Sequence, residues 1–208
     1  MYNPPAFQMT ETSAIHAVMR QARVANFITA TPDGLMASLL PMILDPSEGE
    51  HGVLYGHLAR ANPQWKAAPT ADALAIFMGP DAYVTPSWYA TKRDTGKVVP
   101  TWNYVTVHAS GPVEFFEDAG LLLDVVTRLT LLHERSRAQP WAVGDAPAPY
   151  IQSQLRGIVG ARMVIRRLEG KAKMSQNRSA EDRAGVAAGL AESESAVERA
   201  AGRIVATD

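Results

Sequence analysis

Residues 24–43 read VANFITATPDGLMASLLPMI, and this stretch decides the fold. Val24 to Ala30 is a run rich in apolar and β-branched residues, which favours a strand. Pro32-Asp33-Gly34 has the chemistry of a tight turn, and Leu35 to Ile43 is a second apolar run. The sequence therefore predicts an antiparallel hairpin.

Further strands are expected between residues 53 and 165, because short apolar runs in this part of the chain end at Gly, Pro or polar residues. The expected strands are 53–56, 73–78, 82–85, 98–116 and 158–165. Gly79-Pro80 is expected to separate two of them, and Gly111-Pro112 to bend the longest. Residues 86–97 and 170–178 are expected to be loops.

Helices are expected before, between and after these strands. Residues 10–22 carry apolar side chains at helical spacing, with Thr10 as a candidate N-cap. The other expected helices are a short one beginning at Asn62-Pro63, then 118–137 and 149–156. Capping-box patterns at Ser179 and Ser195 predict two terminal helices. Strands followed by helices indicate a barrel-centred α+β fold.

Composition excludes several classes of chemistry. The 208 residues are 47% hydrophobic and 20% charged, which is ordinary for a globular protein, and no cysteine is present. The net charge of −1 offers no long-range attraction to a polyanion, so DNA binding would need a local basic patch. The N-terminus lacks signal-peptide features, and no apolar run approaches the roughly 20 residues of a membrane span, so a cytoplasmic protein is expected.

Common catalytic motifs are missing as well. The chain contains no dinucleotide-binding glycine pattern, no Walker loop and no nucleophile elbow. His133-Glu134 is not followed by the second histidine of a zinc-protease helix. The five histidines show no metal-ligand spacing, so no metal site is expected.

The segment from Tyr55 to Trp65 concentrates hydrogen-bond donors. His57, Arg60 and Asn62 adjoin a predicted helix N-terminus, where backbone amides favour an anion such as phosphate. The alternative is that Arg60 pairs with a carboxylate and Asn62 only caps the helix. Sequence alone favours neither reading.

Two later segments also carry more aromatic and polar side chains than a hydrophobic core requires. Trp88, Tyr89, Trp102 and Tyr104 lie in loops or at strand ends, where their rings could stack on a flat heterocycle or pack a dimer interface. Residues 171–178 carry three cations around Ser-Gln-Asn, which suits phosphate, DNA or simply a solvated loop.

The order of these segments resembles the PaiB-type FMN-binding negative transcriptional regulators. The matching stretches are MYNPPAF (1–7), ASLLP (37–41), GHLARANP (56–63), GPDAYVTPSWY (79–89), VPTWNY (99–104) and GKAKMSQN (170–177). The resemblance implies an α+β fold with an antiparallel, FMN-binding split β-barrel, flanking helices and a helical C-terminal tail. It places the FMN-binding domain at 1–178 and the tail at 179–208.

The resemblance also implies a homodimer with FMN at the interface. The flavin ring would lie along 37–40, the segment 55–62 would take the phosphate through His57 and Arg60, and Trp88, Trp102 and Asn103 would come from the interface side. The implied cofactor-binding residues are Ala37, Ser38, Leu39, Leu40, Tyr55, Gly56, His57, Arg60, Asn62, Trp88, Trp102, Asn103, Lys171, Lys173 and Gln176.

Three functions remain open at this point. The first is a regulator that senses a flavin and acts on gene expression, with DNA as a partner. The second is a flavin-dependent oxidoreductase, or a haem-binding or haem-degrading split-barrel protein with haem as the weaker cofactor choice. The third is a ligand carrier. Residues 171–175 fall where related oxidases carry an Arg-x-Arg-Leu-His run, and here lysines and Ser175 replace the arginines and the histidine, which disfavours the oxidase reaction.

Overall fold

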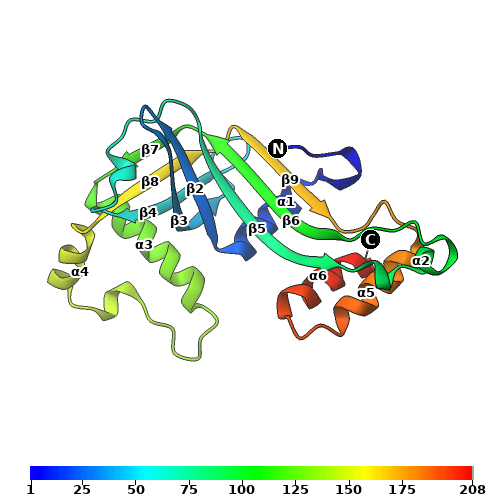
Figure 1. The fold of residues 1–208 in the computed structure, drawn as a ribbon. Coiled ribbons are helices and arrows are strands. Elements are labelled where there is room, and N and C mark those ends of the chain that lie inside the picture. The colour runs from blue at the N-terminus through cyan, green and yellow to red at the C-terminus, as the bar shows by residue number, and fades with distance from the viewer. Residues whose placement is uncertain (208) are drawn as a thin grey trace. The chain divides into compact units, whose positions relative to one another are not determined.

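The computed structural model describes residues 1–207 and divides them into two compact units (Figure 1). Unit 1 contains Met1–Val18, Met78–Val107 and the chain from Glu169 onward, and unit 2 contains Met19–Phe77 and His108–Leu168. Four elements pass from one unit to the other: helix α1 (Thr12–Ala22) and strands β5 (Ala73–Val84), β6 (Thr101–Gly111) and β9 (Arg167–Lys173).

Unit 2 is a curved antiparallel sheet with helices. Its strands are β2 (Val24–Thr31), β3 (Gly34–Asp45), β4 (Val53–Ala59), β7 (Val113–Phe116) and β8 (Ile158–Val164), together with the first part of β5. They are hydrogen-bonded in the order β5-β2-β3-β4-β8-β7. The rings of Phe27 on β2 and Phe115 on β7 meet edge to face at 6.5 Å. Because β2 and β7 are not neighbours in the sheet, this contact requires the sheet to curl as a barrel does.

The β2–β3 hairpin follows the expected alternation. Its register pairs Thr31 with Gly34, and Gly34 has φ +118°, a conformation that glycine adopts without strain. Ala25 and Phe27 are fully buried, while Val24 and Asn26 on the opposite face are exposed. A one-residue slip would exchange these faces, so burial of Phe27 fixes the register.

Helix α3 (Ala119–Glu134) covers part of this sheet. Asp118 caps it by accepting a hydrogen bond from the Leu121 amide. Val125 and Leu129 of α3 pack on Tyr55 of β4 and on Ile43 of β3. Two short 3-10 helices, η2 (Pro63–Trp65) and η4 (Val143–Asp145), and helix α4 (Ala148–Leu155) complete unit 2.

Unit 1 joins a second group of strands to the terminal helices. Strands β1 (Gln8–Met9), β9 (Arg167–Lys173), β6 and β5 are hydrogen-bonded in that order. The remaining elements are η1 (Pro5–Phe7), η3 (Pro86–Trp88), α2 (Ala90–Thr95), α5 (Ala180–Ala191) and α6 (Ala196–Thr207). Val186 and Leu190 of α5 and Val205 of α6 share a core with Val84 and Tyr89. The predicted domain boundary at residue 178 stays a prediction.

The glycines of α5 have a packing role. A Cβ atom on Gly189 would lie 2.2 Å from Cε2 of Trp88, and one on Gly185 would lie 2.0 Å from the Trp88 carbonyl oxygen. Such distances are far inside van der Waals contact. The two glycines, which weaken the helix intrinsically, thus let η3 approach α5.

Most expected elements are confirmed: the hairpin, the helices at 118–137 and 149–156, and both terminal helices. Three expectations were wrong. Gly79-Pro80 does not end a strand, because β5 runs through it and Gly79 instead allows close approach to the Val105 side chain. The predicted loop 86–97 contains η3 and α2, and the first part of the predicted loop 170–178 belongs to β9, which is held by pairing with β1.

The strand expected at 98–116 is two strands, β6 and β7, interrupted at Pro112, which has no amide to donate. Among the described residues, no helix combines the length and apolar character that crossing a bilayer requires.

Candidate functional site

The residues singled out from the sequence fall into two sets, one in each unit. Unit 2 holds Ala37, Ser38, Leu39, Leu40, Tyr55, Gly56, His57, Arg60 and Asn62. Unit 1 holds Trp88, Trp102, Asn103, Lys171, Lys173 and Gln176.

A polar network joins β3 to the loop after β4. The Asn62 side-chain amide donates to Ser38 Oγ at 2.8 Å, and Ser38 Oγ donates to Gln64 Oε1 at 2.6 Å. Asn62 also caps η2 by accepting from the Gln64 amide. Gln64 Nε2 donates to the Phe27 carbonyl and to Thr29 Oγ1 of β2, both at 3.2 Å. Ser38 and Asn62 are thus brought together, and the loop is tied to the hairpin.

Arg60 is held at the end of β4 by three kinds of partner. Its Nε donates to the Arg156 carbonyl at 2.6 Å, one terminal nitrogen donates to the Ile158 carbonyl at 3.3 Å, and the other pairs with Glu117. The guanidinium also lies over the Trp65 ring. Its side chain is 39% exposed, so an anion can reach it if Glu117 gives way.

The other predicted residues of β4 differ in their surroundings. Tyr55 is buried, and its hydroxyl donates to the Glu48 carboxylate and accepts from Arg162. Gly56 faces β3 so closely that a Cβ atom would lie 2.9 Å from the Pro41 carbonyl oxygen. The Tyr55 hydroxyl already donates to Glu48, so it offers no free donor to a phosphate.

The outward face of β2, β3 and β5 is apolar and open. Leu35 is 77% and Leu39 63% exposed, and Ala37 lies exposed between them on the same face of β3. The register sets Ala37 beside Ile28 and Ile28 beside Leu74, so the face continues across all three strands. Leu40, on the opposite face of β3, is part of the core. An exposed apolar surface of this kind is typical of an interaction site.

In unit 1 an exposed tryptophan lies beside a lysine. Trp102 is 54% exposed and meets Tyr83 edge to face at 5.8 Å. Lys173 donates to the Trp102 carbonyl at 2.7 Å and to the Thr101 hydroxyl. Burial lowers the pKa of the Lys173 ammonium below its ordinary value.

The remaining residues of this set are tied into unit 1. Lys171 is buried, lies over the Tyr104 ring and donates to the Tyr2 carbonyl at 3.1 Å. Asn103 is fully buried and bonded to Ser175 at 3.1 Å. Gln176 braces its own turn by donating to the Ala172 carbonyl and accepting from the Met174 amide. Trp88 packs against α5.

His57 opens into a separate pocket of unit 2. The pocket lies beneath α3, η4 and α4 and has a volume of about 280 Å³. The Nδ1 atom of His57 is buried and has no hydrogen-bond partner among the described residues. Burial lowers the pKa of the imidazole below its ordinary value of 6.5, so the ring is neutral at neutral pH.

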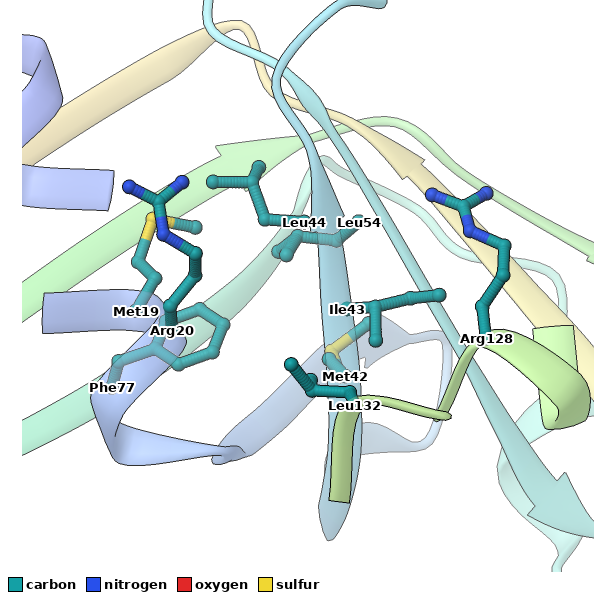
Figure 2. Close-up of a pocket in the computed structure, with 9 residues that line it drawn as sticks. All are labelled: Met19, Arg20, Met42, Ile43, Leu44, Leu54, Phe77, Arg128 and Leu132. Carbon is teal, nitrogen blue, oxygen red and sulfur yellow. The ribbon is translucent and has the colours of Figure 1, made fainter. Parts of the chain in front are cut away.

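A smaller cavity of about 170 Å³ lies between the end of α1, β3 and α3 (Figure 2). Its walls are apolar, with Ile43 and Leu132 among them, and Arg20 and Arg128 stand on either side. Arg128 is paired with Asp45 at 2.9 Å. None of the predicted site residues lines this cavity.

The comparison with known families decides the identity. Residues 1–167 match the family described as "Putative FMN-binding domain". The chain belongs to this PaiB-type FMN-binding family. It is 30% identical to protease synthase and sporulation protein PAI 2 of Bacillus subtilis, with 88% of this chain and 85% of that protein covered. An uncharacterized protein of Emericella nidulans is 34% identical, with 85% and 88% covered.

Solved structures support the fold of this PaiB-type protein. The FAD and heme binding protein of Mycobacterium smegmatis superposes with a TM-score of 0.59 at 14% identity, covering 88% of this chain and 80% of that chain. The α+β split-barrel fold, predicted from sequence, is therefore confirmed. At this identity the likeness concerns the fold alone.

The chemical types of the residues in unit 2 of this PaiB-type chain suit FMN. A flavin needs a flat apolar support, hydrogen-bonding groups at its polar edge and a cation for its phosphate. Unit 2 offers the exposed face around Leu39 and the Arg60 guanidinium, and the Ser38–Asn62 pair lies on the opposite face of β3. Which of these residues touch the cofactor stays a prediction.

Two residues of this neighbourhood were missed by sequence reasoning. Gln64 is 1% exposed and holds the Asn62 loop, and Glu117 neutralises Arg60. Gln64 follows Asn62-Pro63 inside a segment already singled out, so its position was a usable signal. Glu117 lies far along the chain from Arg60, and nothing in the sequence connects the two.

Stability should depend on pH through His57. The unfolded chain binds a proton near the ordinary pKa of 6.5, whereas the folded protein resists protonation because its pKa is lowered. This contribution is therefore fully present above pH 6.5 and is lost as the pH falls through the lower folded-state value. Thermal denaturation of the wild type and of His57→Leu between about pH 7.5 and pH 5 should show a shallower acid-side loss in the variant. Parallel curves would contradict the expectation.

Proposed function

We propose that this chain binds FMN as a homodimer and acts as a negative regulator of gene expression. The observation that carries the proposal is the open apolar face of β2, β3 and β5 in a chain of the FMN-binding family. Arg60 belongs to the same unit, whereas the Ser38–Asn62 pair lies on the opposite, core-facing side of β3. The apolar face offers a support for the flavin ring, and Arg60 offers a cation for its phosphate.

The apolar face favours a second copy of the chain as its occupant. Leu35, Leu39 and Val24 are all exposed on neighbouring strands, and leaving them in water forgoes about 25 cal/mol for each Å² of apolar surface. A two-fold axis would pair the face with itself, as in most homodimers. FMN at this interface would meet Leu39 and Ala37 of β3.

The phosphate is assigned to the end of β4. Arg60 is the partly exposed cation of that segment, and a guanidinium can hold two phosphate oxygens at once. Glu117 is the competitor that phosphate binding would displace. The exposed Trp102 and neighbouring Lys173 of unit 1 are proposed to reach the cofactor from the partner copy.

The regulatory part rests on the resemblance to the PaiB-type regulators, and the name of the Bacillus subtilis relative concerns protease synthesis and sporulation. A net charge of −1 demands a local basic surface for DNA. Lys92, Arg93 and Lys97 are exposed in and after α2 and provide one.

FMN affinity should respond to the Arg60–Glu117 pair. Arg60→Ala should weaken FMN binding by about 1.5–3 kcal/mol, the range for a hydrogen bond to a charged group. Glu117→Gln should leave FMN affinity unchanged or raise it, because it releases the guanidinium. Riboflavin, which lacks the phosphate, is the control and should bind both variants like the wild type. Fluorescence titration measures the FMN and riboflavin affinities of the wild type and of both variants. If Arg60→Ala lowered riboflavin affinity as much as FMN affinity, Arg60 would act only structurally.

Dimerisation should depend on the apolar face. Leu39→Lys places a charge in the proposed interface and should convert the dimer to a monomer in sedimentation velocity, with loss of FMN binding. Leu131→Lys is the matched control, since Leu131 is 56% exposed on α3, outside the proposed interface. A monomeric wild type, or a dimer insensitive to Leu39→Lys, would refute the interface.

Direct DNA binding should depend on salt and on α2. We would titrate the protein against the promoter DNA of its own gene in a gel-shift assay. Affinity should fall steeply from about 50 mM to about 200 mM salt, because binding releases counterions from the DNA. Lys92→Ala with Arg93→Ala should weaken binding, whereas Lys66→Ala with Arg156→Ala removes equal charge elsewhere and should not. Absence of any shift at the lower salt would argue against direct repression.

A further inference from the structure

The pocket beside His57 has the composition of a ligand site. Val126 of α3, Ile151 of α4 and Ile158 of β8 contribute apolar walls. Trp141 and Tyr150, which also line it, remain 46% and 57% exposed. Large aromatic side chains left partly in water at the border of an apolar pocket are typical of a surface that a ligand completes.

The pocket carries no charge. None of its lining residues is Asp, Glu, Lys or Arg. Its polar groups belong to Thr130, Trp141, Tyr150, Gln154 and His57, whose imidazole is neutral at neutral pH. An ionised ligand would lose its hydration there without gaining a counter-charge. A neutral ligand avoids that penalty.

His57 supplies the specific element. Its Nδ1 atom is buried without a partner, a costly arrangement that proteins rarely keep. A neutral imidazole has one N–H donor and one acceptor nitrogen. Leaving the buried Nδ1 as an unpaired acceptor is less unfavourable than leaving an N–H there, so the proton belongs on the other nitrogen, Nε2. The ring then presents an N–H donor at Nε2, for which no hydrogen bond occurs among the described residues.

We propose that this pocket binds a neutral aromatic molecule of one or two rings that carries a hydrogen-bonding oxygen, such as a phenol. The volume of about 280 Å³ is at the small end of ligand pockets, which suits a compact ring system. His57 binds the oxygen, and Trp141 and Tyr150 pack on the rings.

The pocket is separate from the apolar face of β3, although it adjoins Arg60, which donates to the carbonyl of the pocket-lining Ile158. His57 lines the space covered by α3 and α4, whereas Leu39 and Ala37 belong to the open face of β3. His57 is also distinct from a metal site, since no group of three metal-ligating side chains occurs within residues 1–207. The inference does not depend on FMN binding or on dimerisation.

Three probes of one shape test the proposal by calorimetric titration of the full chain at neutral pH: 2-naphthol, naphthalene and 2-naphthoate. We expect 2-naphthol to bind, and 2-naphthoate to bind at least about tenfold more weakly because its charge is not compensated. Equal binding of 2-naphthoate would overturn the proposal, as would failure of 2-naphthol to bind.

Two variants locate the ligand. His57→Leu introduces an apolar side chain of similar size and removes the buried unpartnered nitrogen, so the protein should fold. Its affinity for 2-naphthol should fall about tenfold relative to that for naphthalene, the loss of one hydrogen bond. Ile151→Trp fills the pocket and should abolish binding of both molecules. An unchanged ratio in His57→Leu would refute the role of the imidazole.

Saturating FMN provides the final control. Binding of 2-naphthol should be the same with and without FMN, because the two sites are separate. Displacement of 2-naphthol by FMN would show that the pocket is part of the flavin site and would overturn the proposal. A chain that binds no FMN but binds 2-naphthol through His57 would refute the proposed cofactor and leave the pocket intact.

Discussion

The pairing of β2 with β3 is the constraint on which the rest of unit 2 depends. Burial of Phe27 on one face of the hairpin leaves Ala37 and Leu39 on the other, because side chains alternate strictly along a strand. The same register carries Ser38 to the Asn62 loop. One hairpin therefore orients the core, the proposed interface and, on the core-facing side, the Ser38–Asn62 pair.

Gln64 and His57 of unit 2 both have buried polar atoms, but they differ in hydrogen bonding. Gln64 is almost completely buried and satisfied by bonds to β2, β3 and Asn62, so it stabilises the loop. His57 is partly buried with an unpartnered Nδ1. A satisfied buried group contributes to the fold, whereas an unsatisfied one costs stability.

The cations of the chain show how context changes the meaning of a residue type. Arg60 is partly exposed but shared among Glu117 and two backbone carbonyls, so any anion must compete for it. Lys171, expected in a basic loop, is instead buried over Tyr104. Lys173 is bonded to its neighbours on β6. Lys171 and Lys173, which stand out in the sequence as part of a basic run, thus make mainly structural contacts within unit 1.

The sequence by itself determined the features that depend on neighbouring residues. The hairpin at 24–43, the capped helices near Asp118 and Ser179, and the strand-rich order of the first two thirds follow from local periodicity, turns and caps. Only the tertiary structure decided that Gly79-Pro80 lies within a strand, that Glu117 meets Arg60, and that Nδ1 of His57 has no partner among the described residues. Those facts depend on strand pairing and packing between residues distant in the chain, which local patterns do not encode.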